Sequence, residues 1–476
     1  MPRSSSVVNI EMITQLEAGN PQLEAKENAD LKEIAVDLVQ RALKAGATGA
    51  EAVVREGSEF SSLVRLGEVE TLKESGAKAL GLRVFLGQRA ASVSSSDFSL
   101  PEIERMAAAA VELARVTSED PYAGLPDPSL LGSIPGDLDL YYDDVYSLST
   151  ADRIDYARRA EAAAMNCDPR IKNSDGGSFD AATGRKVLAN SLGFVGEYRR
   201  SYCSVAAMPI AQTEDGSMQR DAWYSVARSL GRLESPEQVG QEAARRTLRR
   251  LGARRVPTQR VPIVFDSTVS RSLIDHIFEA ANGDVIYRHA SYLTGKLGEK
   301  IAGENITIID DGTIPGGFGT SPFDGEGVPT RRTVVVERGV LKNYLLNSYT
   351  AKKLGMQTTG NAARGLAGNP GIGSGNFFLE KGSKTPQEII REVKNGFYLT
   401  EFLGFGVNLV TGDYSRGASG IWIENGELTY PVEEITVAGS LKEMFMNIVD
   451  IGNDLEWRGS TACPTLRIDG MMIAGA

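Results

Sequence analysis

Histidine is scarce in this chain, which contains only two, His276 and His289, among 476 residues. Any serine–histidine, cysteine–histidine or histidine–metal mechanism must therefore use one or both of them. His276 stands three residues before Glu279, a spacing that places both side chains along one border of a helix. The pair can form half of a metal site, or simply a hydrogen-bonded pair beside a buried face. His289 lies thirteen residues further on, past a glycine, and does not share that helix face.

A second group of chemically active side chains lies in the segment 411–417, Thr-Gly-Asp-Tyr-Ser-Arg-Gly. Asp413, Tyr414, Ser415 and Arg416 combine a carboxylate, a phenol, a hydroxyl and a guanidinium, which suits binding of a peptide backbone or a carboxylate. The flanking glycines predict a loop, and a structural loop explains the composition as well as a binding loop does. We take these four residues as candidates for substrate binding and assign no catalytic residue.

Motifs for nucleotide and thiolate chemistry are missing from the sequence. The run Gly371-Ile-Gly-Ser-Gly375 follows an Asn-Pro pair rather than a strand, so it lacks the context of a dinucleotide-binding turn, and no P-loop occurs. The three cysteines are widely spaced and form no CxxC pair. Asp310, Asp324 and Glu326 lie in glycine-flanked segments; such carboxylates can act as acids or bases, but they are also typical of turns.

The composition is that of an ordinary globular protein, with 42% hydrophobic and 24% charged residues. Lys and Arg number 51 and Asp and Glu 62, so the formal net charge is −11. Direct nucleic-acid binding is disfavoured, because it requires a basic face. No stretch approaches the roughly 18 apolar residues of a membrane span, and no signal-like run opens the chain. These features and the few cysteines predict a cytoplasmic protein without membrane contact.

The first half of the chain alternates expected helices and strands. Apolar spacing predicts a helix from Leu31 to just before Gly46, and a Ser99–Glu102 capping box begins another. Ser149 or Thr150 begins a third helix, and Ser235-Pro-Glu-Gln238 a fourth. Strands are expected at 52–54, 60–66, 80–91 and in segments through 187, 194 and 204–209.

The second half is richer in strands and glycine. We expect strands at 261–265 and 306–309, a helix at 269–281, and a hairpin formed by 333–337 and 340–346. Asn425-Gly426 predicts a hairpin between 421–424 and 427–430.

The expected fold is α+β, with a mixed helix and sheet N-terminal half followed by a strand-rich C-terminal domain of twisted sheets. We expect a mobile tail at 1–30, an N-terminal α/β domain at 31–225 and a C-terminal β-rich domain at 235–476. The Pro- and Gly-rich stretch 118–137 indicates a linker or a sub-boundary within the first domain.

Several segments together resemble the TldD/PmbA family of peptidases, once called modulators of DNA gyrase, and its PmbA or TldE branch in particular. The resemblance covers nearly the whole chain from about residue 31. It rests on Gly81-Leu-Arg-Val84, Ser321-Pro-Phe-Asp-Gly-Glu-Gly-Val328, Ser348-Tyr-Thr-Ala-Lys-Lys-Leu-Gly355, Thr359-Gly-Asn361, Thr411-Gly-Asp-Tyr-Ser-Arg-Gly-Ala-Ser-Gly420, Asp450-Ile-Gly-Asn-Asp-Leu455 and Met472-Ile-Ala-Gly475.

The resemblance implies one subunit of a cytoplasmic TldD/TldE metallopeptidase that trims unfolded or leader peptides. TldD-type chains hold zinc through His-Glu-x-x-x-His on a helix and a distant third ligand. In this chain Asp275, His276 and Ala280 occupy those three motif positions, so neither histidine ligand is kept. A carboxylate and an alanine do not replace two imidazoles around tetrahedral zinc. We expect no cofactor in this chain and zinc in a TldD-type partner, and we do not take Cys463 as a ligand.

Three functions therefore stay open. The chain can complete the substrate channel of a peptidase whose zinc lies in a TldD-type subunit, which we favour, and it can form a homodimer when alone. It can be an independent metallopeptidase that uses His276 and Glu279. It can also be a non-enzymatic binding or regulatory protein that acts on gyrase.

Overall fold

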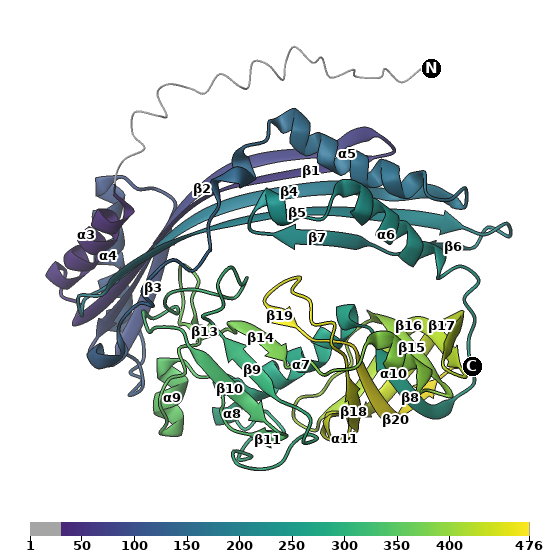
Figure 1. Cartoon of the computed structure of the whole chain (residues 1–476). Helices are drawn as coiled ribbons and strands as arrows, with labels where there is room; N and C mark the ends of the chain where they lie inside the picture. The colour runs from purple at the N-terminus through teal and green to yellow at the C-terminus, as the bar shows by residue number, and fades with distance from the viewer. Residues whose placement is uncertain (1–29, 476) are drawn as a thin grey trace.

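The computed structural model describes residues 30–475, in two halves that lie one above the other (Figure 1). Apart from Asp30, the tail predicted at 1–30 lies outside the described residues. The long strands of the first half arch over the C-terminal half (Figure 1). The predicted α+β class is confirmed, since both halves combine helices with sheets.

One seven-stranded antiparallel sheet, which we call the long sheet, forms the first half. Its strands lie in the order β3-β2-β1-β4-β5-β6, and β7 also pairs with β5. The bounds are β1 Gly49–Arg65, β2 Glu68–Leu86, β3 Arg89–Ser95, β4 Ile171–Asn190, β5 Val195–Gln212, β6 Met218–Arg220 and β7 Trp223–Ala227. Four of these strands have 17 to 20 residues, so separate helices can pack at each end of one sheet.

Two helix pairs bury the apolar side chains of the long sheet. Helices α3 (Leu31–Lys44) and α4 (Leu100–Val116) share one core with β1 and β2. Helices α5 (Thr150–Met165) and α6 (Pro236–Leu248) share another with β4 and β5, and both begin with capping boxes, from Ser149 and Ser235. The capping box predicted at Ser99–Glu102 is wrong, because the Ser99 side chain makes no cap hydrogen bond and the Glu102 carboxylate accepts from Arg105 instead. Because α6 packs on the long sheet, the first half extends past residue 235, where we had expected the C-terminal domain to begin.

The stretch predicted as a linker, 118–137, runs along the C-terminal half. The backbone N–H of Gly132 donates to the carbonyl of Gly327, and that of Ile134 to the carbonyl of Pro322. Among the described residues, the first half has three short 3-10 helices: η1 (Pro128–Leu130), η2 (Asp143–Tyr146) and η3 (Leu230–Arg232).

Strands of the C-terminal half form a six-stranded sheet in the order β17-β16-β15-β8-β20-β18, and β17 also pairs with β20. That pairing closes five of the strands into a ring. The bounds are β8 Gln259–Phe265, β15 Asn395–Leu403, β16 Asp413–Glu424, β17 Glu427–Ser440, β18 Ile448–Ile451 and β20 Leu466–Ala474. The Asn425-Gly426 hairpin is confirmed, with φ of 53° and 83° at its two residues. The loop predicted over 411–417 is wrong from Asp413 onward, where β16 begins.

The helix α7 (Ser267–Ala281) contacts α8, β14, β15 and β19. A second sheet has the order β11-β10-β9-β14-β19, and β12 pairs with β13. The strand bounds are β9 Ile308–Asp311, β10 Arg332–Glu337, β11 Val340–Leu341, β12 Ala362–Ala363, β13 Gly371–Ile372, β14 Asn376–Leu379 and β19 Thr461–Ala462. The helix bounds are α8 Gly283–Tyr287, α9 Ser348–Leu354, α10 Pro386–Arg391 and α11 Leu441–Met446. In the described part of the chain, no helix is long and apolar enough to cross a membrane.

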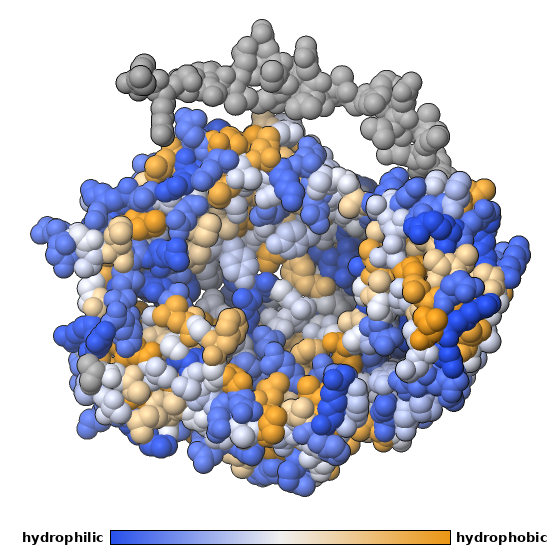
Figure 2. All heavy atoms as spheres, turned by 180° about the vertical axis from the view of Figure 1, so that it is seen from behind, coloured by the Kyte–Doolittle hydropathy of each residue, from blue (hydrophilic) through white to orange (hydrophobic). Residues whose placement is uncertain are grey.

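Contacts between the two halves join the long sheet to the segment 312–328. The Arg228 guanidinium donates to the carbonyl oxygens of Gly316, Gly317 and Phe318. The ring of Phe323 packs against Val53 and other side chains of the sheet. Seen from behind, the surface is hollowed between the two halves (Figure 2).

Candidate functional site

Helix α7 carries the predicted histidine and lies between two strands of different sheets. Asp266 caps the helix by accepting a hydrogen bond from the Thr268 N–H at 2.9 Å. Its apolar face is buried in the core of the C-terminal half, and so its polar residues are directed to its sides. His276 contacts β16, and Asp275 contacts β19. The helix therefore has two polar flanks, which we call the β16 flank and the β19 flank.

The His276–Glu279 pair is present on the β16 flank. His276 Nδ1 lies 3.3 Å from Glu279 Oε2, and the Glu279 side chain is 52% exposed. The imidazole lies edge-on to the ring of Tyr414, with the centroids 6.0 Å apart. Among residues 30–475, nothing is within hydrogen-bonding distance of His276 Nε2, which is buried. The contact between His276 and Glu279 expected from their spacing is therefore present, and the second ring nitrogen of His276 makes no hydrogen bond within the described residues.

The four residues predicted to bind substrate divide between the two faces of β16. Because side chains of a strand alternate, Tyr414 and Arg416 share the face towards α7, whereas Asp413 and Ser415 are exposed on the other. The Arg416 guanidinium lies 4.2 Å from the Phe402 ring centroid, and its Nη1 donates to Ser272 Oγ of α7 at 3.5 Å. The structure therefore brings Tyr414 and Arg416 to α7, and it leaves Asp413 and Ser415 away from the helix.

Tyr414 is a buried phenol without a hydrogen-bond partner among the described residues. Burial raises the pKa of its hydroxyl well above the ordinary tyrosine value, against a smaller opposing effect of the Arg416 charge. The hydroxyl therefore stays protonated at neutral pH and can donate a hydrogen bond.

An exposed apolar loop connects β15 and β16 beside this flank. Phe405 is fully exposed, and Leu403 and Val410 are about half exposed. The loop is fixed to the strand, because the Ser415 N–H donates to the carbonyl of Gly406 at 2.6 Å. Phe405 was not among the residues predicted from the sequence, although an aromatic residue between two glycines can indicate an exposed contact.

The β19 flank combines a carboxylate, an arginine and a thiol. Asp275 Oδ1 accepts a hydrogen bond from Thr461 Oγ1 at 2.9 Å, and burial raises the pKa of Asp275. Arg271 Nη1 donates to the Tyr224 hydroxyl of the long sheet at 3.3 Å. Burial also raises the pKa of the Cys463 thiol, which stays protonated. A small cleft of about 60 Å³ opens here, lined by Tyr224, Ser267, Thr268, Arg271, Glu456, Arg458, Thr461, Ala462 and Cys463.

The glycine-flanked carboxylates are buried, Asp324 and Glu326 in a turn and Asp310 in strand β9. Asp324 accepts hydrogen bonds from the backbone N–H groups of Glu326, Val328 and Ala362, as turn-forming aspartates do. Asp310 accepts from Asn361 Nδ2 at 2.7 Å and from a backbone N–H. Burial raises the pKa of Asp324 to about 6 and those of Asp310 and Glu326 to about 7.

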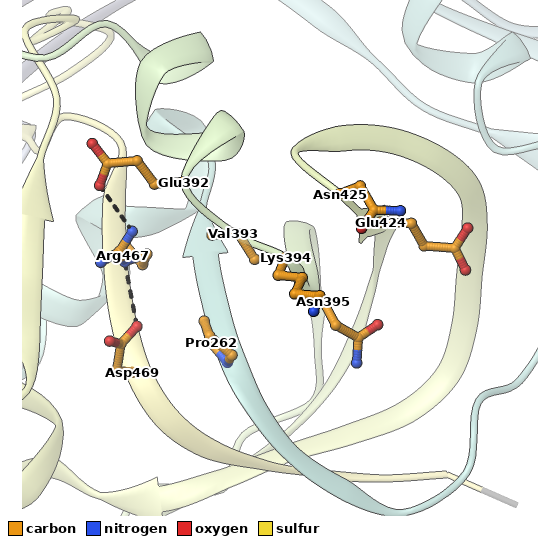
Figure 3. Close-up of a pocket in the computed structure, with 9 residues that line it drawn as sticks. All are labelled: Pro262, Glu392, Val393, Lys394, Asn395, Glu424, Asn425, Arg467 and Asp469. Atoms are coloured by element: carbon orange, nitrogen blue, oxygen red, sulfur yellow. Dashed lines mark hydrogen bonds and ion pairs between the residues drawn. The ribbon is translucent and has the colours of Figure 1, made fainter.

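A polar cleft beside α10 has a volume of about 540 Å³. In Figure 3, Arg467 lies between Glu392 and Asp469 and is joined to both, while Asn395, Glu424 and Asn425 line the opposite wall. Arg467 also pairs with Asp450 at 3.0 Å. The carboxylates of its own wall thus neutralise this arginine, and none of the predicted site residues lines the cleft.

Within residues 30–475, no three His, Cys, Asp or Glu side chains are grouped so that they could hold a metal ion. Asp275, His276 and Ala280, the positions singled out on α7, do not converge. Asp275 is bonded to β19, His276 lies against β16, and Ala280 is fully buried in the core.

Comparisons with known proteins agree over almost the whole chain. Three family models match: PmbA/TldA metallopeptidase domain 1 at residues 50–114, the central domain at 143–251 and the C-terminal domain at 258–475. The metalloprotease PmbA of Escherichia coli O157:H7 is 40% identical over 90% of this chain and 92% of its own length.

Two crystal structures show the same fold. A candidate modulator of DNA gyrase from Bacteroides thetaiotaomicron superposes with a TM-score of 0.87 at 30% identity, covering 94% of this chain and 99% of that one. TldE from Thermococcus kodakarensis superposes with a TM-score of 0.84 at 20% identity, covering 93% and 100%.

Proposed function

Because this chain belongs to the PmbA/TldD metallopeptidase family, we propose that it is the TldE-type subunit of a TldD/TldE peptidase. In this proposal the complex works in the cytoplasm and trims unfolded or leader peptides. The chain contributes substrate-binding surface, and a TldD-type partner contributes the catalytic zinc.

The arrangement of α7 is the observation that supports this division of roles. Zinc in a peptidase needs three protein ligands around one point and an open fourth position. Asp275 and His276 lie on opposite flanks of α7, and the Ala280 methyl offers no donor atom. These residues do not fit a zinc ion, and we derive no step through a metal in this chain.

The β16 flank supports a role in holding a peptide. Arg416 is partly exposed and can form paired hydrogen bonds with a carboxylate or a carbonyl. The buried Tyr414 ring packs against Phe402, the ring over which the Arg416 guanidinium lies. Phe405, beside them in the β15–β16 loop, offers an exposed aromatic ring for an apolar side chain. Together they provide polar and apolar contacts suited to an unfolded peptide.

Metal content and peptide cleavage, measured together, test the proposal. The chain is purified without chelator, its metals are counted by elemental mass spectrometry, and cleavage of an unfolded peptide is assayed with and without a TldD-type subunit. We expect less than a tenth of a zinc ion per chain and cleavage only after mixing. One zinc per chain with independent cleavage that His276→Ala abolishes would instead establish the independent metallopeptidase. No cleavage in either case, with capture of gyrase, would favour the regulatory function that the name of the Bacteroides structure suggests.

A further inference from the structure

A group of positive charges lies on one face of the long sheet. Arg55 of β1 pairs with Lys186 of β4, and Lys186 pairs with Tyr198 of β5. These three residues therefore form one row across the sheet, with their side chains on the same face. Arg200 follows Tyr198 by two residues and is directed to that face as well, because side chains alternate along a strand. We call Arg55, Lys186 and Arg200 the cation cluster.

The cation cluster faces the C-terminal half. Val53 and Leu188, which pair with each other in the adjacent row of the same face, pack against Phe323 of that half. Helices cover the opposite face, where Val54 and Val187 belong to the core shared with α3 and α4. The cluster therefore lies on the underside of the arch that the long strands form over the C-terminal half (Figure 1).

No carboxylate neutralises the cluster. Within residues 30–475, none of its three cations forms an ion pair at 4.0 Å or less. The buried carboxylates of the neighbouring segment are engaged elsewhere, since Asp324 and Glu326 accept hydrogen bonds from backbone N–H groups. Glu51 pairs with Arg83 and Arg364. Three positive charges thus share one small area of the sheet without a negative partner from the described chain.

The two guanidinium groups are held in place but keep free donors. Arg55 Nη2 donates to the carbonyl of Arg364 at 2.5 Å, and Arg200 Nη2 donates to the carbonyl of Thr320 at 2.8 Å. The Nε atoms of both arginines are buried and have no hydrogen-bond partner in the described part of the chain. Buried donors in folded proteins nearly always have a partner, so these two indicate a bound group that accepts hydrogen bonds.

A pair of glycines leaves space beside the cluster. The next row of the sheet pairs Gly57 with Gly184, and Gly184 with Arg200. A Cβ atom added to Gly184 would meet only the carbonyl oxygen of Glu56, at 3.9 Å, apart from its own chain neighbours. The members of the cluster are partly exposed, and the surface between the two halves is hollowed (Figure 2). This face therefore leaves room for a ligand beside the three cations.

We propose that the cation cluster binds carboxylate groups of the peptide substrate, so that acidic peptides are held under the long sheet. This inference rests on the proposed peptidase function and names the peptides that this chain binds most tightly. A carboxylate offers two acceptor oxygens to the free Nε–H groups of the arginines and to the Lys186 ammonium. Side chains alternate along an extended peptide, so an acidic residue can point to the cluster while the peptide backbone approaches Gly57 and Gly184.

Binding of short unfolded peptides to the full-length chain, measured by isothermal titration calorimetry, tests the proposal. A glutamate-rich peptide with an amidated C-terminus is compared with the same peptide carrying glutamines, and with the glutamine peptide carrying a free C-terminus. We expect a peptide carboxylate, from the side chains or from the C-terminus, to tighten binding at least tenfold at low salt. Equal binding of all three peptides would overturn the proposal. Tighter binding of inorganic phosphate than of any peptide would also overturn it, and would assign the cluster to phosphate.

Substitution of Lys186 tests the position of the site. Lys186→Gln should weaken binding of the carboxylate-bearing peptide at least tenfold, whereas Lys186→Arg should retain it. Lys172→Gln is the matched control, because it removes the same charge from the same strand, β4, at a position far from the cluster. Circular dichroism establishes that each variant is folded. Equal affinities for Lys186→Gln and Lys172→Gln would overturn the proposal.

Zero-length coupling locates the site in the natural chain. A carbodiimide joins a carboxylate to a lysine amine only where the two are in contact, and mass spectrometry identifies the lysine. We expect the bound peptide to couple to Lys186, and coupling only at lysines outside the cluster would overturn the proposal. These measurements need neither a partner nor cleavage, so the two proposals fail separately. Carboxylate binding without cleavage by the mixed subunits would refute the proposed function alone, and cleavage without preferential carboxylate binding would refute this site alone.

Discussion

Tyr414 of β16 lies edge-on to His276 of α7, with the ring centroids 6.0 Å apart and the ring planes inclined by 71°. The contact joins the His276–Glu279 pair to the segment 413–416, although Tyr414 lies 138 residues after His276 in the chain. Neither the Tyr414 hydroxyl nor His276 Nε2 has a hydrogen-bond partner in the described part of the chain. Both atoms are buried, so each is an unpaired polar atom inside the fold.

Two substitutions of Tyr414 separate its packing from its hydroxyl. Tyr414→Phe removes a buried hydroxyl without a partner, so the free energy of unfolding should stay within about 1 kcal/mol of its natural value. Tyr414→Ala removes the buried ring and should cost about 3–5 kcal/mol. Urea unfolding followed by circular dichroism measures both. Equal losses for the two variants would mean that the hydroxyl holds an interaction in the folded chain.

Arg416 should affect peptide cleavage more than Asp413 does, because only Arg416 faces α7. With a TldD-type partner present, Arg416→Ala should lower kcat/KM by about 10- to 100-fold, the loss of one charge-assisted hydrogen bond of about 1.5–3 kcal/mol. Asp413→Ala should have a smaller effect. Arg255→Ala is a control, since Arg255 is an exposed arginine paired with Glu434 elsewhere. If the double variant Asp413→Ala/Arg416→Ala folds normally and its kcat/KM is unchanged, neither residue contributes to peptide binding.

Stability should fall as pH rises from about 4 to about 7, because of the buried carboxyl groups. The folded-state pKa of Asp310 is raised to about 7. Between about pH 4 and pH 7 the folded chain keeps a proton on this carboxyl group that the unfolded chain releases. The stabilisation from this proton is full below about pH 4 and is lost as the pH passes 7. A shift of three pKa units corresponds to at most about 4 kcal/mol. Urea midpoints from pH 4 to 8 should show a shallower slope for Asp310→Asn, and an unchanged slope would refute the assignment.

A buried ion triad connects the long sheet to the C-terminal half. Glu51 Oε1 lies 3.1 Å from Arg83 Nη1 and 2.5 Å from Arg364 Nη1. Glu51→Gln leaves two buried guanidinium groups without a carboxylate, so we expect a loss of about 3–5 kcal/mol in the free energy of unfolding. Glu337→Gln, at an exposed pair with Lys342, should cost less than about 1 kcal/mol. Thermal unfolding compares the two, and equal small losses would show that the triad contributes little.

The sequence by itself determined the local elements. The apolar spacing of α3, the helix start at Ser149, the capping box at Ser235 and the Asn425-Gly426 turn depend on neighbouring residues, and the structure contains each of them. The His276–Glu279 pair is of the same kind, because one helical turn fixes it.

Only the tertiary structure decided which segments pair with or pack against each element. The glycines around 411–417 indicated a loop, but pairing with β15 and β17 makes a strand from Asp413, and alternation along it separates Tyr414 and Arg416 from Asp413 and Ser415. Helix α6 joined the first half because its apolar face is buried on the long sheet. Strand pairing and burial join residues far apart in the chain, and no local pattern specifies those partners.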